Sequence, residues 1–171
     1  WALLTGGNSR AFPASEIMLF PELLPKGCQP VLISRSGYTS EVIEVARYLE
    51  QKLRVPTLAV TCGTATPLEK ISRHVLRLAA ADEKSTVMTR SFTSMLLALQ
   101  MMAAERSGRR EFAGALESLP AKTEPHLANM QATIRSVVNS QKFADYVFLG
   151  QGPFFGRSEE HTSELQSRHN L

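Results

Sequence analysis

The chain has 171 residues, of which 43% are hydrophobic and 20% charged, and its net charge is +3. This composition is close to the average of soluble globular domains and excludes the disordered, collagen-like and disulfide-rich classes. No apolar run approaches the roughly 20 residues of a membrane-spanning helix, no signal-peptide pattern opens the chain, and the basic residues form no one-sided stripe. We therefore expect a cytoplasmic domain with neither a membrane nor a nucleic acid as partner.

Short β-branched runs alternate with helical patterns in chain order. Between the first two runs, apolar residues recur at helical spacing from Val42 to Leu53, and Pro56 ends this helix. A parallel strand–helix–strand unit has this pattern, so we predict an α/β fold, a three-layer αβα sandwich around a parallel sheet. The predicted strands are residues 30–34, 56–61, 74–78 and 145–149.

Two helical regions are predicted after the third strand. The first covers residues 90–105 and is apolar on both faces, so it should be buried in the core or at an interface. The second region, residues 110–140, is expected to divide into two helices, with a break at Pro120 and around residues 123–125.

The cysteines and histidines before residue 157 form no site pattern. Cys28 and Cys62 share no CxxC spacing, and His74 and His126 are isolated in the sequence. A structural zinc site needs about four ligands at short paired spacings. We therefore expect no metal and no cofactor, and we interpret the cysteines as buried thiols.

A hydroxyl-rich turn follows the first predicted strand. The residues Ser34-Arg35-Ser36-Gly37-Tyr38-Thr39 lie between this strand and the helix that follows. The free N–H groups and the positive dipole end of a helix attract anions, hydroxyl side chains add donors, and Gly37 allows a tight turn. The turn is thus a candidate phosphate site. On the residues alone, it could equally be a turn in which Thr39 only caps the helix.

Four blocks of the sequence resemble the sugar isomerase (SIS) domain family. The segment VLISRSGYTSEVIEVARYL resembles the family's Ser-x-Ser-Gly-x-Thr phosphosugar signature between a strand and a helix. Residues 83–97 resemble its later Thr-rich helix entry, residues 11–21 resemble the segment before the signature strand, and residues 145–156 resemble the start of a second SIS domain. Such tandem domains occur in the isomerase half of glutamine:fructose-6-phosphate aminotransferase and in related aminosugar-phosphate deaminase/isomerases. The resemblance implies a flavodoxin-like, doubly wound sheet.

The resemblance also implies a ligand and residues that bind it. Ser34, Ser36 and Thr39 would hold the phosphate of a hexose or aminosugar 6-phosphate, helped by the backbone N–H groups of Arg35 and Gly37. Arg35 replaces a frequent Gln, and its guanidinium could pair with the phosphate or face away.

A second set of sugar contacts is implied only in part. Thr86 and Met88 stand where the aminotransferases have sugar-contacting Val and Ser, so Thr86 is a possible contact and Met88 cannot make the hydroxyl contact. This difference favours the deaminase/isomerase branch. Tyr38 replaces a frequent Glu of the signature, and we assign it no role.

The resemblance predicts that the chain is a fragment. Residues 1–140 would be a first SIS domain that lacks its first strand, and residues 141–156 would begin a second one. Residues 157–167, RSEEHTSELQS, resemble the translation of a short-read sequencing adapter, and we expect the tail of residues 157–171 to be artefactual. In tandem enzymes the catalytic Glu, His and Lys come from the second domain and its tail, so we predict no catalytic residue here.

Three hypotheses follow for the intact protein. The first is a homodimeric enzyme that isomerises, deaminates or aminates a hexose or aminosugar 6-phosphate. The second is a phosphosugar-sensing SIS module of a transcriptional regulator. The third is a dimerisation module in which the hydroxyl turn has no ligand.

Overall fold

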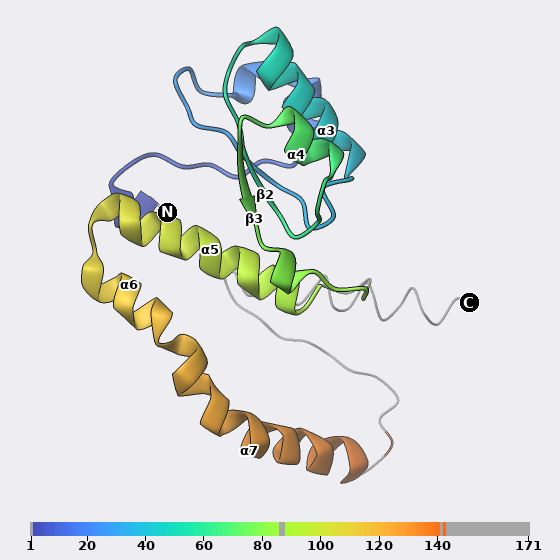
Figure 1. Cartoon of the computed structure of the whole chain (residues 1–171), viewed down its shortest axis with the longest axis vertical. Helices are drawn as coiled ribbons and strands as arrows, with labels where there is room; N and C mark the ends of the chain where they lie inside the picture. The colour runs from blue at the N-terminus through green and yellow to red at the C-terminus, as the bar shows by residue number, and fades with distance from the viewer. Residues whose placement is uncertain (1, 86–87, 141, 143–171) are drawn as a thin grey trace. The chain divides into compact units, whose positions relative to one another are not determined.

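The structure is a computed structural model of the whole chain, and it describes residues 2–85, 88–140 and 142. The chain divides into two compact units, Trp1–Glu117 and Ser118–Leu171. Each unit is described by itself, and Figure 1 shows the course of the chain through the elements of both.

A three-stranded parallel sheet forms the centre of the first unit. The register places Leu32 of β1 opposite Ala59 of β2, and Val60 of β2 opposite Leu76 of β3. Three predicted strands are therefore confirmed, each one or two residues shorter than expected, whereas residues 145–149 lie outside the described residues. The strands are hydrogen-bonded in the order β1 (Val31–Ile33), β2 (Leu58–Thr61) and β3 (His74–Arg77).

Helices cover both faces of this sheet (Figure 1). Successive side chains of a strand point to opposite faces, so Ala59 and Val60 enter different layers. Ala59 packs with Ala46 of α3 and Leu68 of α4, whereas Val60 packs with Met95 of α5. The predicted three-layer αβα architecture is thus confirmed. The elements that form the two outer layers are α3 (Ser40–Arg47), η2 (Tyr48–Lys52) and α4 (Pro67–Ile71) on one side and η3 (Ala79–Ala81) and α5 (Arg90–Ser107) on the other.

The helix after β1 has the predicted buried stripe but a different end. Val45 and Leu49 are 3% and 1% exposed, as their spacing predicts. From Tyr48 the helix widens into the π-helical turn η2, which ends at Lys52. Leu53 therefore lies outside the stripe and is 44% exposed. The Glu50 carboxylate of η2 accepts hydrogen bonds from Thr57 N–H and Oγ1 and from Arg73 N–H, which attaches this turn to the amino ends of β2 and β3.

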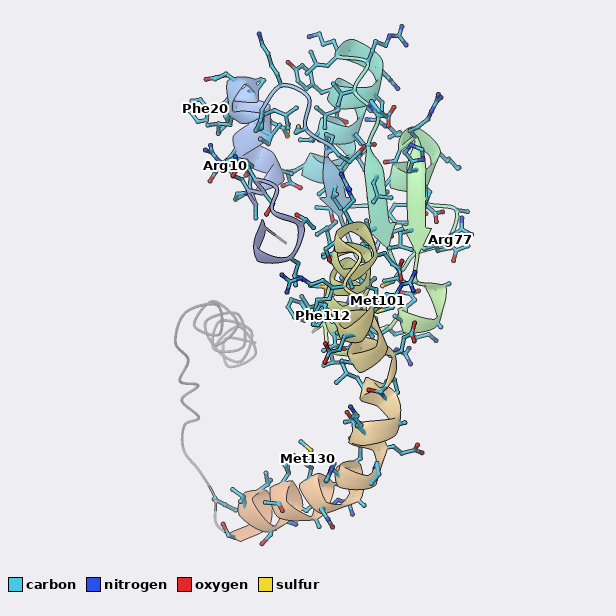
Figure 2. All side chains as sticks on the ribbon, turned by 90° about the vertical axis from the view of Figure 1, so that its left-hand side faces the viewer. Arg10, Phe20, Arg77, Met101, Phe112 and Met130 are labelled. Carbon is cyan, nitrogen blue, oxygen red and sulfur yellow. The ribbon has the colours of Figure 1, made fainter. Side chains whose placement is uncertain are left out.

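Both apolar faces of α5 are covered within the first unit. Met95 and Leu99 pack on the sheet, and the other face contacts α6 (Arg110–Glu117) through Leu97 and Met101. Figure 2 shows Met101 and Phe112 near each other at this helix pair. The two helices are separated by Gly108, whose φ of 67° ends α5 in the left-handed conformation.

The residues before β1 form the short helices α1 (Ala2–Thr5), α2 (Ala14–Leu19) and η1 (Pro21–Leu23). Of these, α1 contacts α5 and α2 packs on the outside of α3. Ile17 of α2 is 6% exposed and packs against Val45 and Leu49. Phe20, at the end of α2, is 52% exposed and is visible at the margin of the molecule in Figure 2.

The predicted division of residues 110–140 into two helices is confirmed, but it falls at Ser118, between α6 and α7 (Leu119–Ser140). α7 is continuous over 22 residues, so the predicted position of the break, at Pro120 and residues 123–125, is wrong. Pro120 lies in the first turn, where a helix needs no N–H donor, and Pro125 is accommodated inside the helix. No side chain of α7 is buried. Its apolar residues Leu127, Met130, Ile134, Val137 and Val138 are each at least half exposed.

Candidate functional site

The predicted phosphate turn begins where β1 ends. Ser34 extends the sheet beyond the strand, because its N–H donates to the Val60 carbonyl at 3.1 Å. The Ser34 side chain is only 5% exposed, whereas Thr39, five residues later, is exposed. The turn therefore leads from the buried centre of the sheet to its surface at the carboxyl edge, where open α/β sheets bind ligands.

The hydroxyl groups of the turn are ordered by hydrogen bonds among themselves. Ser34 Oγ and Thr39 Oγ1 are 2.8 Å apart, and Ser34 Oγ also accepts the N–H of Gly37 at 3.1 Å. The N–H of Tyr38 donates to Ser36 Oγ at 3.1 Å. Ser34 and Thr39 are thereby brought together across the turn, with Ser36 beside them. All three predicted phosphate-binding side chains belong to this one cluster.

Thr39 occupies the N-cap position of α3 without capping the helix through its side chain. Its φ and ψ are −61° and 116°, and no hydrogen bond runs from the first-turn amides to its hydroxyl, which is directed to Ser34. The first N–H groups of a helix have no intrahelical acceptor, and they carry the positive end of the helix dipole. The Thr39 side chain therefore contacts Ser34 and does not cap the first-turn amides of α3.

Gly37 is required by the conformation and the packing of the turn. Its φ is +69°, a region that L side chains rarely adopt. A Cβ at this position would lie 2.3 Å from Oγ1 of Thr66, in the loop after β2. A Cβ at Gly63 would likewise lie 2.4 Å from the Ser36 carbonyl oxygen. The turn and the loop after β2 are thus in direct contact, and each has a glycine at the contact where a Cβ would not fit.

Arg35 joins the turn to two other parts of the sheet edge. Its carbonyl accepts the N–H groups of Cys62 and Gly63 at 2.9 and 3.0 Å. Thr61 Oγ1 donates to the same carbonyl at 3.1 Å. The Arg35 guanidinium donates to the carbonyl of Ser85, fifty residues further along the chain. The side chain is therefore directed toward the segment before α5, and its pairing with a phosphate remains a prediction.

The start of α5 already has an anion, supplied by Glu83. Its carboxylate accepts the N–H of Thr89 at 2.9 Å and of Ser91 at 3.2 Å, and it also accepts both hydroxyl groups. The hydroxyl bonds from Ser91 and Thr89 lower the pKa of Glu83 to about 2. The Glu83 carboxylate is thus the hydrogen-bond acceptor for the N–H groups of Thr89 and Ser91 at the start of α5.

The predicted sugar contact at Thr86 lies outside the described residues, as does Val87. Met88 is described and is 37% exposed. Two guanidinium groups reach the neighbouring segment, since Arg35 donates to Ser85 and Arg90 to the Asp82 carbonyl. Of these two, Arg35 belongs to the turn itself, and its guanidinium could form a charge-assisted bond to a phosphate.

The cysteine and histidine side chains that the structure describes lie apart from the turn's hydroxyl cluster or are exposed. Burial, with the charges of Asp82 and Glu83, raises the pKa of the Cys62 thiol, which favours the protonated, weakly nucleophilic form. His74 and His126 are exposed. Within the described ranges, no three His, Cys, Asp or Glu side chains come together as a metal site would require, and no helix there is long and apolar enough to cross a membrane.

Sequence reasoning missed Gly63 and Thr66, which shape the turn from outside the signature. Thr66 is fully buried and is the N-cap of α4, where it forms a capping box with Glu69. The spacing Thr66-Pro67-Leu68-Glu69 is the capping-box pattern, with proline at the first helical position. This signal could have located α4 and hence the loop that contacts Gly37.

Comparison with known proteins identifies the family of the chain. The SIS domain family matches residues 12–105, which is more than half of the chain. Glutamine–fructose-6-phosphate aminotransferase of Clostridium perfringens is 27% identical over 145 residues, covering 80% of this chain and 24% of that protein. The enzyme of the same name from Methanothermobacter thermautotrophicus is 25% identical over 122 residues, covering 71% of this chain and 20% of that protein. The chain thus spans less than a quarter of the length of these relatives.

Solved structures share the fold. A candidate phosphosugar isomerase from Silicibacter pomeroyi has a TM-score of 0.56 at 22% identity and covers 70% of this chain and 37% of that one. A candidate phosphosugar isomerase involved in capsule formation in Bacteroides fragilis has a TM-score of 0.57 at 24% identity, with coverages of 65% and 60%. The Vibrio vulnificus NanR protein, solved with ManNAc-6P, has a TM-score of 0.53 at 22% identity, with coverages of 74% and 48%.

A parallel sheet between helical layers, with a hydroxyl-rich turn at its carboxyl edge, defines an α/β domain with a candidate anion-binding turn. The chain belongs to the SIS domain family.

Proposed function

We propose that this chain binds the phosphate group of a hexose or aminosugar 6-phosphate at the turn from Ser34 to Thr39. The observation that carries the proposal is the clustering of three hydroxyl side chains at the start of α3, whose first turn has no side-chain cap. A phosphate oxygen there would accept hydrogen bonds from hydroxyl and backbone donors and would lie at the positive end of the helix dipole.

The side chains of the turn would have different roles in binding, according to how exposed each of them is. Ser34 is nearly buried and holds Thr39 and the Gly37 N–H, so it orders the turn and presents the Thr39 hydroxyl. Ser36 and Thr39 are the more accessible donors. Arg35 would add a charge-assisted bond if its guanidinium moved from the Ser85 carbonyl to the ligand, because a phosphate is the stronger acceptor.

The parent of this domain would be an enzyme that isomerises, deaminates or aminates the sugar phosphate. Support comes from two aminotransferase relatives that each match more than two thirds of the chain. Moving a proton between the first two carbons of a sugar needs a positioned base. We assign no such base to the described residues, so the catalytic groups, and a homodimer that would complete the site, are proposed for the longer protein.

A regulatory module is the second candidate function. The structural likeness to NanR supports it. NanR was solved with ManNAc-6P, so a protein other than the aminotransferases combines this fold with a bound sugar phosphate. The contiguous reading frame separates the two candidates. A second SIS domain after residue 156 would support the enzyme, whereas a helix-turn-helix segment before residue 1 would support the regulator.

Titration calorimetry of the full chain tests the binding proposal. We expect glucosamine 6-phosphate or fructose 6-phosphate to bind and the unphosphorylated sugars not to bind. Ser36→Ala should weaken binding by roughly tenfold, because a hydrogen bond to a charged group is lost. Ser107→Ala is the matched control, since this hydroxyl donates to the Ala104 carbonyl at the far end of α5. Equal affinity of both variants for the sugar phosphate, or equal binding of sugars with and without phosphate, would contradict the proposal.

A further inference from the structure

We propose that Thr66, in the loop after β2, is a positioning residue that holds the phosphate-binding turn in its binding conformation. The inference rests on the proposed function, because it adds to that site a residue from a second loop. Thr66 is 29 positions from Gly37 in the sequence and lies outside the Ser-x-Ser-Gly-x-Thr signature. It is fully buried, so it acts on a ligand only through the turn.

The contact between Thr66 and the turn is close on the side where Gly37 has no side chain. A Cβ at Gly37 would lie 2.3 Å from Thr66 Oγ1, 2.6 Å from its Cβ and 2.9 Å from its Cγ2. The space that any other residue would fill at position 37 is thus filled by Thr66. The Cγ2 methyl also lies 2.7 Å from the position of a Cβ at Gly63. One threonine side chain therefore separates and supports the two glycine backbones.

Hydrogen bonds fix Thr66 itself to the sheet. Its Oγ1 accepts the Glu69 N–H at 3.3 Å, and its own N–H donates to the Glu69 carboxylate at 3.2 Å. Glu69 in turn pairs with Arg77 of β3, and the Arg77 side chain is labelled in Figure 2. The Leu68 N–H donates to the Gly37 carbonyl at 3.3 Å. The turn after β1 is thereby connected through α4 to β3.

This connection holds the backbone of the turn in one conformation. A binding loop that already has its bound conformation loses less conformational freedom on binding and so binds more tightly. The packing of Thr66 fixes the backbone of Gly37, and the Gly37 N–H fixes the hydroxyl of Ser34 that is paired with Thr39. Loss of the Thr66 side chain should therefore weaken phosphate binding without removing any group that touches the phosphate.

Three substitutions separate the packing of Thr66 from its capping of α4. Thr66→Ala removes both, Thr66→Val keeps the shape and removes the capping hydroxyl, and Thr66→Ser keeps the hydroxyl and removes the Cγ2 methyl. Thr57→Ala is the matched control. Thr57 is equally buried, lies before β2 at the opposite edge of the sheet, and donates to Glu50 at 2.7 Å.

Affinity for a hexose 6-phosphate and the thermal midpoint are measured for each full-length variant. We expect Thr66→Ala to raise the dissociation constant about three- to tenfold. Thr66→Val should bind nearly as the unsubstituted chain does but melt at a lower temperature, and Thr66→Ser should show the opposite pattern. Thr57→Ala should lower only the melting temperature. Unchanged affinity in Thr66→Ala, or weaker binding by Thr66→Val than by Thr66→Ser, would overturn the proposal.

Amide hydrogen exchange of the unliganded chain tests the positioning step separately from binding. In Thr66→Ala the amides of Gly37 and Tyr38, which donate within the turn, should exchange faster relative to Ala113 of α6, which reports overall opening. An unchanged ratio would overturn the positioning role whether or not sugar phosphates bind. If the unsubstituted chain bound no sugar phosphate while this ratio changed, the proposed function would fail and Thr66 would be a residue that only orders the turn.

Discussion

Gly37 is the position of the turn at which backbone conformation and packing most strongly require a glycine. Both its positive φ and the lack of space beside Thr66 argue against any side chain there. Gly108 has nearly the same φ, +67°, but a Cβ there would meet nothing within 4 Å. The two glycines therefore separate the energetic cost of the left-handed conformation from the cost of the close contact.

We predict that Gly37→Ala destabilises the fold by more than about 2 kcal/mol, whereas Gly108→Ala costs only about 1 kcal/mol, the usual penalty for an L residue in this conformation. Urea unfolding of both variants measures the difference. Similar losses in the two variants would mean that the turn and the loop after β2 are not in the close contact described above.

At the residue scale, the sequence was sufficient to locate the three hydroxyl side chains of the turn but not their surroundings. The signature between Ser34 and Thr39 is local, so its position could be found from a strand pattern, a glycine and a helix pattern. Thr66 and Gly63 contact the turn only after β1 and β2 have paired. Contacts of that kind depend on the register of the sheet, which the strand patterns alone do not determine.

The start of α5 shows how an element can be stabilised by a side chain that precedes it. Glu83 receives two backbone and two hydroxyl hydrogen bonds from Thr89 and Ser91. Its pKa in the folded protein is about 2, below its ordinary value of 4.5. A carboxyl group whose pKa is lowered by folding stabilises the fold above its unfolded pKa, and this contribution is lost as the pH falls toward the folded pKa.

We therefore predict that Glu83→Gln lowers stability at pH 7 and removes part of the acid sensitivity of the chain. The unsubstituted chain should lose stability as the pH falls from about 5 to about 2, and the variant should lose less over the same interval. Urea midpoints at pH 7 and pH 3 measure this, with Glu105→Gln, which changes an exposed carboxylate inside α5, as control. Parallel pH profiles for the unsubstituted chain and Glu83→Gln would contradict the role of Glu83.

At the element scale, long periodic segments were predictable and short or proline-containing ones were not. The helix α5 was expected at residues 90–105 because its apolar residues recur over several turns. It ends only two residues later than predicted. The helix α4 has five residues, too few for a periodic pattern, so only its capping box could have indicated it. The two helices of residues 110–140 were expected, but the break between them was placed too late, because a rule that proline breaks helices ignores the tolerance of proline in the first turn and inside a long helix.

At the scale of the whole molecule, the buried core of the described residues lies in the first unit. The four clusters of buried apolar residues are drawn from positions 17 to 116. The elements that carry the turn, its supporting loop and the segment before α5 all precede Glu117 as well. By contrast, α7 contributes no buried side chain, and its Met130 is 54% exposed (Figure 2).

We predict from this distribution that residues 1–117 fold without the second unit and retain the proposed binding site. A chain of this length can bury enough surface to be stable alone, and the deletion removes no buried residue of the described helix α7. The shortened chain should unfold cooperatively in urea, with a midpoint close to that of the full chain, and should bind hexose 6-phosphates with the same affinity. Loss of the cooperative transition would show that residues after Glu117 contribute to the core. An unchanged transition with weaker binding would show that they contribute to the site.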